Sequence, residues 1–432
     1  MKRPSILFFL VLLSSAVYAQ QLVLEKVTVV SRHGVRAPLD SYISTLEEMT
    51  GDNFQWPRWA VPGSNLTLRG GALEMLFGEY FKLWLDDEHL YEKCAKVQDV
   101  YFGASSKQRT IATARSFAAG LFPLMAVPID YKLTADSAIG FLDRDYLPLL
   151  NCVSAPDGNF DTNKFKEEAY SELGQMQAPS YQFLEEVLRM SQSRYAKKKG
   201  IAHFDDKIGV RLDFYNSATG CPLEPTMCGG LKDAIMASDA FILQYYEMAN
   251  ATDSVFGRKL SFEDREKLAS VNDSYRYFLF SKAPIISVNV SHCMLQRIQT
   301  ELSAGGHRFA FFCTHDSMIE ALLAALRTEP YILRNSIEAK TPIGCKLVFE
   351  QWTETCCLNP KKYIRIRMLY QSADQIREMR IMDLANPPMS CEITFEGLKK
   401  ASNGMYYYDD FMKHIQKSID AYKATAQGKR PW

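Results

Sequence analysis

The chain has 432 residues, of which 47% are hydrophobic and 12% aromatic, and its 50 Lys and Arg residues balance its 50 Asp and Glu residues. This length corresponds to about two domains, and the apolar content is enough for packed cores, which excludes a disordered protein. The formal net charge is zero and the longest basic run is Lys197-Lys198-Lys199, which argues against nucleic acid as a partner.

The N-terminal segment has the pattern of a secretory signal. Lys2 and Arg3 precede an apolar stretch from Ile6 to Leu13, and Val17-Tyr18-Ala19 offers the small residues that a signal peptidase prefers. This stretch is too short to span a membrane. We therefore expect residues 1–19 to be removed, which leaves a secreted or periplasmic chain that begins at Gln20 and has no membrane span.

The run from Leu22 to Val30 is rich in Val and Leu and predicts a largely buried strand. It leads into Ser31-Arg32-His33-Gly34-Val35-Arg36-Ala37-Pro38, in which Gly34 and Pro38 end the strand. In open α/β sheets, ligands bind beyond the carboxyl ends of the strands. The arginine side chain matches phosphate oxygens and stays charged, so Arg32 and Arg36 around His33 suggest a phosphate site. The alternative is an ordinary basic loop with a hydrogen-bonded histidine.

The next elements are a helix, a strand and a second helix. Residues 67–85 form a predicted helix capped by Thr67, and Val100 to Gly103 form a short strand. An alanine-rich helix follows, opened by Ser105-Ser106-Lys107-Gln108-Arg109-Thr110 and running to about Leu121. Because a helix N-terminus favours anions, Arg109 would strengthen a phosphate site there. The alternative is a solvated surface arginine.

Residues 131–290 have a different character, mostly helical and polar with irregular Gly, Pro and Asn. We interpret them as a mainly α-helical cap inserted into an α/β core made of residues 20–130 and 291–432. No repeat and no Gly-rich or Pro-rich linker separates the two parts, so the cap should sit on the core as one unit.

A second strand with a polar tip appears late in the chain. Arg308 to Thr314 is apolar and ends in His315 and Asp316, and a helical pattern follows from Ser317 to Leu326. The same strand-to-helix geometry as at His33 would bring these side chains to the same sheet edge. Phosphomonoester cleavage needs a nucleophile, cations for the phosphoryl oxygens and an acid for the leaving group, and the two segments supply all three. The alternative role for Asp316 is an N-cap.

Ten cysteines suit an oxidising compartment, and Cys221 with Cys228 is the pair that we most expect to form a disulfide. A zinc site is the competing interpretation, but this spacing fits no common ligand pattern. Cys313 lies in an apolar strand and is expected to be a buried thiol. Four sequons, which matter only in a eukaryotic host, occur at Asn65, Asn250, Asn272 and Asn289.

The segment from Arg32 to Pro38 together with His315-Asp316 resembles the histidine acid phosphatase branch of the histidine phosphatase superfamily. Further segments carry the resemblance across most of residues 22–380: Leu66-Thr67-Leu68-Arg69-Gly70, Gln108-Arg109-Thr110, and Thr341-Pro342-Ile343-Gly344 with Phe349, Gln351 and Trp352. Trp56-Pro57-Arg58-Trp59 and Leu369-Tyr370-Gln371-Ser372-Ala373 are similar to the bacterial glucose-1-phosphatase subgroup, which the Thr341 segment also resembles. One departure is Gly34, where that subgroup carries Asn.

The resemblance implies a mixed sheet flanked by helices, a phosphoglycerate-mutase-like core, and catalysis without metal or cofactor. By the family mechanism, His33 takes the phosphoryl group as a covalent phosphohistidine and Asp316 protonates the leaving oxygen. The phosphoryl oxygens would be held by Arg32, Arg36, Arg109 and His315. Protonation of Asp316 requires either an acidic medium or a pKa raised by the site. The remaining histidines lie in no metal-ligand spacing: His89, His203, His292, His307 and His414.

The resemblance also suggests sugar phosphates such as glucose 1-phosphate as substrates. Glu247, in a segment similar to one that lies over the family's site, would disfavour the highly phosphorylated phytate. The alternative for Glu247 is a surface carboxylate. Phytase and broad acid phosphatase activity remain alternative functions, with a phosphate-binding protein or a mutase-like transferase more remote. A homodimer through the sheet edge is a family-level expectation.

Overall fold

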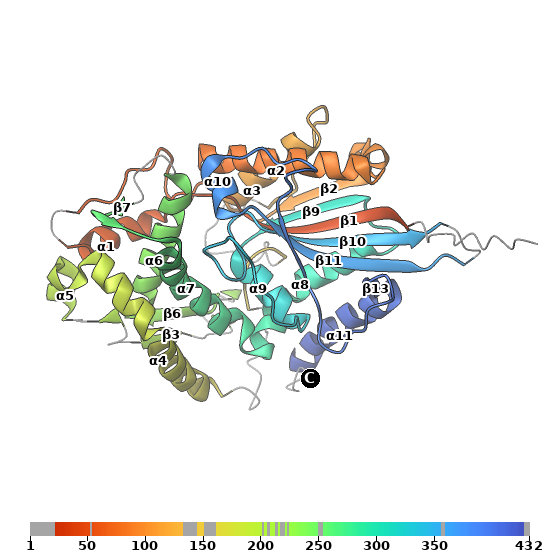
Figure 1. Ribbon diagram of the computed structural model, residues 1–432. Helices are drawn as coiled ribbons and strands as arrows, with labels where there is room; N and C mark the ends of the chain where they lie inside the picture. Colours follow the sequence, from red (N-terminus) through yellow and green to blue (C-terminus); the bar gives the residue numbers. More distant parts are fainter. Residues whose placement is uncertain are drawn as a thin grey trace, which may run out of the picture.

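The structure is a computed structural model that describes residues 22–51, 54–132, 145–150, 161–200, 203–204, 208–211, 215–216, 221–222, 224–248, 254–355 and 359–426. The expected signal segment and the sequon at Asn250 lie outside these residues. The described part is a sheet with helices on both faces and a helical lobe at one end of it (Figure 1).

A mixed sheet forms the core. Its strand order is β12-β11-β10-β1-β9-β2, with β13 paired to β11. The parallel strands are β1 (Leu22–Arg32), β9 (Phe309–Thr314) and β2 (Val100–Ala104). The antiparallel ones are β10 (Lys346–Glu354), β11 (Lys362–Tyr370), β12 (Met389–Glu392) and β13 (Tyr406–Tyr407). This arrangement confirms the expected α/β class.

The register of the central strands positions the site. β1 lies between β9 and β10, and all six residues of β9 are buried, as the apolar run predicts. Ser31 pairs with Cys313 and Arg32 with Thr314, so the chain leaves both parallel strands at the same level. His33 and His315 are the next residues, and the two imidazoles therefore meet at one edge of the sheet.

Helices cover both faces of the sheet (Figure 1). On one face, α2 (Leu68–Asp87) and α3 (Gln108–Leu121) pack on Val27, Val29 and Phe311. Thr67 caps α2 as expected, because its side chain accepts a hydrogen bond from the Gly70 amide. On the other face, α8 (Pro284–Leu302), α9 (Asp316–Ala325) and α11 (Tyr408–Ala426) pack on alternate residues such as Phe312. Short 3₁₀ turns at Tyr91–Cys94 and Val97–Asp99 precede β2.

The lobe at the end of the sheet is mainly helical. It contains α4 (Thr162–Leu188), α5 (Arg194–Lys199), α6 (Gly230–Glu247) and α7 (Phe262–Arg276), with a 3₁₀ turn at Met190–Gln192 and a π-helical turn at Tyr277–Ser281. Three small antiparallel ladders join β3 (Ile208–Arg211) to β6 (Thr226–Gly229), β4 (Tyr215–Asn216) to β5 (Cys221–Pro222) and β7 (Ser254–Val255) to β8 (Arg258–Lys259). We call this lobe the cap.

Two elements lie across the expected domain boundaries, which stay a prediction. Helix α1 (Asp40–Met49) lies beside α5 and α6 of the cap (Figure 1), although its residues fall in the segment assigned to the core. The expected boundary at residue 290 falls inside α8, which starts at Pro284 and packs on α9, α11 and β1. Because a continuous helix moves as one body, all of α8 belongs with the core.

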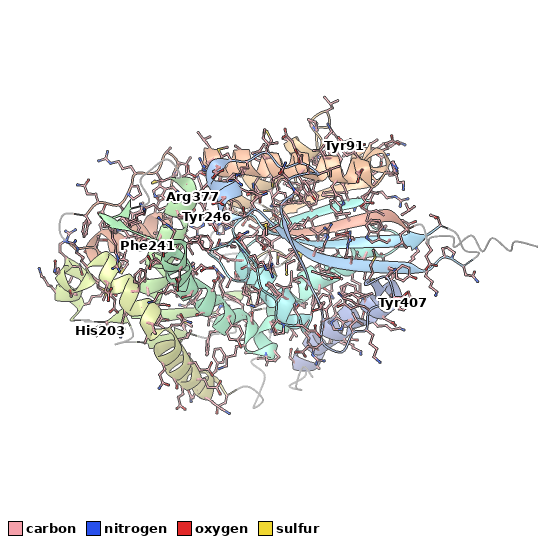
Figure 2. All side chains as sticks on the ribbon, viewed as in Figure 1. Tyr91, His203, Phe241, Tyr246, Arg377 and Tyr407 are labelled. Atoms are coloured by element: carbon pink, nitrogen blue, oxygen red, sulfur yellow. The ribbon has the colours of Figure 1, made fainter. Side chains whose placement is uncertain are left out.

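The cap and the core also meet where α6 approaches α10 (Ala373–Glu378). Arg377 donates a hydrogen bond to the backbone oxygen of Tyr245 at 2.7 Å, and its guanidinium lies 4.3 Å from the centre of the Tyr245 ring. Figure 2 labels Arg377 beside Tyr246, the next residue of α6. A half-buried arginine over an aromatic face stabilises such a contact by about 1 kcal/mol.

The expected disulfide between Cys221 and Cys228 is wrong. Cys228 is an exposed thiol in no disulfide, and the two residues belong to different ladders, Cys228 opposite Gly209 and Cys221 opposite Asn216. Cys313 is buried, as expected.

The sequons at Asn272 and Asn289 lie buried in α7 and α8, so the folded chain does not present them for glycosylation.

None of the described helices is by itself long and apolar enough to cross a bilayer. Phe262–Ser281 together with Pro284–Leu302 reaches the required length and apolar content, but this pair is bent by 84° and its residues are largely buried in the protein.

Candidate active site

The structure brings together all the residues predicted from the two strand ends. His33 and His315 follow β1 and β9, Arg109 lies in the first turn of α3, and Asp316 opens α9. The rings of His33 and His315 meet edge to face with their centroids 5.4 Å apart. Three chain segments that are distant in sequence thus converge at the carboxyl ends of parallel strands.

His33 is held as a neutral ring with one nitrogen fixed. Its Nδ1 lies 2.9 Å from the backbone oxygen of Gly34, and a carbonyl only accepts hydrogen bonds, so Nδ1 carries the proton. Burial and the nearby Arg109 hold the pKa of the His33 imidazole well below its ordinary value. The lone pair on Nε2 is therefore available, which suits a nucleophile.

Three arginines supply unused donors around His33. The Nε atoms of Arg32, Arg36 and Arg109 are buried, and none has a hydrogen-bond partner among the described residues. A buried donor without a partner is costly, so such groups are usually satisfied by a bound group. Phosphoryl oxygens match these planar donors. The chemistry of the three guanidinium groups therefore suits an anion.

His315 orients Arg109. Its Nδ1 lies 3.3 Å from a terminal nitrogen of Arg109, which can only donate, so Nδ1 is the acceptor and Nε2 carries the proton. Nε2 then donates to the hydroxyl of Ser105 at 3.2 Å. Burial and Arg109 hold the pKa of His315 well below its ordinary value. A direct contact between His315 and a phosphoryl oxygen stays a prediction.

Asp316 is paired with two arginines. The sequence analysis singled out Arg32 as a site residue but not Arg276. Its Oδ2 lies 3.0 Å from Arg32 and 3.0 Å from Arg276, while Oδ1 accepts the backbone N–H of Ser317 at 2.8 Å. Burial opposes ionisation, but the two guanidinium groups outweigh it and hold the pKa of the Asp316 carboxyl well below its usual range. Of the two expected routes to a protonated Asp316, a pKa raised by the site is therefore wrong, and an acidic medium stays a prediction.

Arg32 and Arg276 also contact acidic side chains that the sequence analysis did not single out. Arg32 is bonded to Glu338 and to the backbone oxygen of Thr341, and Arg276 donates to Asp273 at 2.7 Å. Glu338 is fully buried and Arg276 is 3% exposed. Two cations thus hold three carboxylates in a buried network, and no local motif marks Asp273, Arg276 or Glu338 in the sequence.

Cap residues add two more carboxylates to the site. Asp239 of α6 accepts two hydrogen bonds from one terminal nitrogen of Arg36, each at 3.0 Å. Glu224 is near Asp316 and Arg109; although part of its surface is open to solvent, desolvation by surrounding atoms and the Asp316 charge raise its pKa to about 7. Sequence reasoning missed both residues, because their neighbours come from the core.

Glu247, the expected specificity residue, lies elsewhere. Its carboxylate accepts a hydrogen bond from the hydroxyl of Thr67 at 2.6 Å, at the N-terminus of α2. This contact favours the alternative of a structural carboxylate, since negative charge stabilises a helix N-terminus. A role of Glu247 in specificity stays untested.

The loop that follows β1 and carries His33 packs against a buried ion pair. Lys346 is fully buried and donates to Glu74 at 2.8 Å and to the backbone oxygen of Gly344 at 2.7 Å. A Cβ added at Gly34 would lie 3.1 Å from the Glu74 side chain, and one at Gly344, where φ is +69°, would lie 2.9 Å from it. The loop after β1 therefore packs closely on this pair, which favours glycine at position 34.

Within the described residues, no group of three or more His, Cys, Asp or Glu side chains is arranged to hold a metal ion. The site instead combines two neutral histidines, three arginines with unused donors and the carboxyl group of Asp316 at a sheet edge beside a helical cap. This set of groups suits phosphate-ester hydrolysis by a histidine nucleophile, so the fold and the site together point to a phosphatase.

Comparisons with known proteins give the family. The sequence pattern of the histidine phosphatase superfamily (branch 2) matches residues 23–371, and the chain belongs to this family. Glucose-1-phosphatase from Providencia rettgeri is 33% identical over 411 residues, which cover 92% of this chain and 93% of that relative. Glucose-1-phosphatase from Salmonella typhimurium is 31% identical over 415 residues, which cover 93% of this chain and 95% of that relative.

A solved structure shows the same fold. The phytase from Citrobacter braakii superposes with a TM-score of 0.77 at 24% identity, covering 92% of this chain and 98% of that chain. The protein is accordingly a phosphoric monoester hydrolase, as the resemblance noted in the sequence implies.

Proposed function

We propose that this protein hydrolyses phosphomonoesters through a covalent phosphohistidine on His33. The observation that carries this proposal is the neutral His33 ring with Nε2 available, surrounded by arginine donors without partners. Nε2 attacks phosphorus and the bond from phosphorus to the leaving oxygen breaks. Asp316 gives its proton to that oxygen.

The second step returns the enzyme to its starting state. Water attacks the phosphohistidine, the Asp316 carboxylate takes a proton from the water, and the phosphorus–nitrogen bond breaks. Arg32, Arg36 and Arg109 hold the phosphoryl oxygens in both steps, because charge shifts among these oxygens in each transition state. Every proton is thereby accounted for without a metal.

Asp316 becomes protonated through the substrate as well as the medium. Arg32 and Arg276 favour its carboxylate form, but a phosphomonoester bound at Arg32 brings negative charge close to Asp316 and opposes their effect. We expect proton uptake on substrate binding and higher activity at acidic pH, because both place a proton on Asp316 before the leaving group departs.

We further propose a sugar phosphate such as glucose 1-phosphate as the substrate. Two curated relatives named glucose-1-phosphatase support this proposal by their identity and coverage. The carboxylate of Asp239 also adds negative charge at the cap side of the site, which disfavours a ring with many phosphates.

Export to the periplasm is part of the same proposal and rests on the signal-like residues 1–19. The cysteine content does not add to it, since Cys94, Cys228, Cys313, Cys345 and Cys391 form no disulfide. Fractionation of the producing cells, followed by N-terminal sequencing of the mature chain, tests both the compartment and the expected start at Gln20.

The deciding experiment measures initial phosphate release from glucose 1-phosphate and from phytate at mildly acidic pH, without added metal. The mature wild-type chain is compared with His33→Ala. Faster release from glucose 1-phosphate supports the proposed substrate, whereas faster release from phytate makes the protein a phytase. Release that does not depend on His33 contradicts the mechanism.

A further inference from the structure

The carboxylate of Asp316 has two unequal oxygens. Oδ2 accepts a hydrogen bond from Arg276 at 3.0 Å and forms an ion pair with Arg32 at 3.0 Å, whereas Oδ1 accepts only the backbone N–H of Ser317 among the contacts that the structure gives this side chain. Two guanidinium groups stabilise negative charge on Oδ2. A proton on Asp316 is therefore favoured on Oδ1.

Arg276 reaches Asp316 from the cap. It is the last residue of α7 and immediately precedes the π-helical turn Tyr277–Ser281. A π-helical turn is rare and widens the helix locally, often at functional sites. Asp273, one turn earlier on α7, holds the other terminal nitrogen of Arg276 at 2.7 Å and also accepts the backbone N–H of Ala339 at 2.8 Å. The guanidinium is thus fixed at both ends.

We propose that Arg276 is a positioning residue for Asp316: shared with Arg32, it holds Oδ2 and leaves Oδ1 to carry the proton toward the leaving oxygen. This inference rests on the proposed function, in which Asp316 is the proton donor. It adds that a cap residue, remote from the phosphate-binding arginines in sequence, fixes the direction from which the proton comes.

Several charged or titratable groups surround Asp316. Those that interact with it electrostatically are Arg32, His33, Arg109, Glu224, Tyr275, Arg276, His315 and Cys345, while Lys107, Asp273, Glu320 and Glu338 act on these neighbours. Among them only Arg32 and Arg276 contact its carboxylate directly. Loss of Arg276 therefore removes one of the two contacts that favour its charged form.

The test compares Arg276→Met with the wild type on glucose 1-phosphate and on an aryl phosphate with a good leaving group. We expect turnover of glucose 1-phosphate to fall about 10-fold or more, and that of the aryl ester much less, because only the poor leaving group needs the acid. The alkaline limb of the pH profile should shift to higher pH, since a cation that lowered the pKa of Asp316 is gone.

Inhibition by inorganic phosphate separates positioning from substrate binding. A positioning role leaves the inhibition constant within about twofold of wild type, since a purely local loss of orientation costs little ground-state affinity. Arg276→Lys should recover part of the lost turnover because it keeps the charge. An unchanged pH limb with equal losses on both esters overturns the proposal, and so does weaker phosphate inhibition that parallels the loss of turnover.

Arg265→Met is the matched control, because Arg265 is also buried on α7 but lies over the ring of Tyr245 at 4.2 Å. In Arg265→Met, the alkaline limb of the pH profile should stay where it is in the wild type. If Arg276→Met does not fold by circular dichroism, Asp273→Asn replaces it, since this change loosens the anchor of Arg276, and it should shift the limb in the same direction. His33→Ala, assayed in parallel, shows separately whether the proposed function itself fails.

Discussion

The rings of His33 and His315 lie edge to face with centroids 5.4 Å apart, held by the neighbouring parallel strands β1 and β9. In this pair, His33 is the proposed nucleophile, and His315 contacts and orients Arg109. Burial and the arginine charges keep both rings neutral. The site thus keeps positive charge and N–H donors without partners on the arginines, where a phosphoryl group needs them, and no charge on the attacking ring.

Replacing His33 by Ala should reduce turnover of every phosphomonoester by at least about 10⁴-fold, because no other group at the site offers a free nitrogen lone pair. Phosphate release and acid-quenched trapping of the phosphoenzyme measure this loss. His203→Ala is the control: His203 lies on the outer part of the cap, labelled in Figure 2, and pairs with Glu185 at 2.9 Å. A labelled phosphoenzyme that survives in His33→Ala contradicts the assignment.

Asp316→Ala should slow hydrolysis of glucose 1-phosphate by about 10²-fold and hydrolysis of an activated aryl phosphate much less, since a good leaving group departs without a proton. The ratio of the two turnover numbers, measured at one acidic pH, is the relevant quantity. Ser317→Ala is a suitable control because the Ser317 contact to Asp316 comes from its backbone. Equal losses on both substrates would remove Asp316 from the role of proton donor.

Glu224 should add a pH effect on substrate affinity. With a pKa of about 7, its carboxyl is neutral below that pH and charged above it. Charge so close to Arg109 and Asp316 repels a phosphate dianion, so the KM of the wild type should rise above about pH 7. The KM of Glu224→Gln should be flatter over the same range, while Glu263→Gln, an exposed change on α7, should follow the wild type. Identical KM profiles for wild type and Glu224→Gln would rule out this effect.

Lys346→Met should destabilise the fold by about 3–5 kcal/mol, because it leaves the carboxylate of Glu74 buried without a partner. Urea unfolding followed by circular dichroism measures the free energy of unfolding. The double variant Glu74→Leu with Lys346→Met should recover much of this loss, since both charges are then gone. A double variant that is less stable than Lys346→Met would show that the pair is not compensated in this way.

The predictable part of the site is encoded in short, contiguous segments. The run Leu22 to Val30, the polar tip at Arg32 and His33, and the matching tip at His315 and Asp316 are local patterns, and the rule for parallel sheets brings such tips together. The cap of α2 at Thr67 is equally local, because an N-cap bonds its own helix. These features follow from the sequence by itself.

The tertiary structure alone decided which distant groups meet. Arg276, Asp239 and Glu224 approach the site from the cap, and each has a core partner that lies far away in the chain. The same holds for the predictions that were wrong. Cys221 and Cys228 are close in sequence but lie in different ladders, and the pKa of Asp316 is lowered because a second arginine arrives from α7. Periodicity and motif spacing report on neighbours along the chain, whereas charge pairing and burial depend on neighbours in space, which only the packed fold defines.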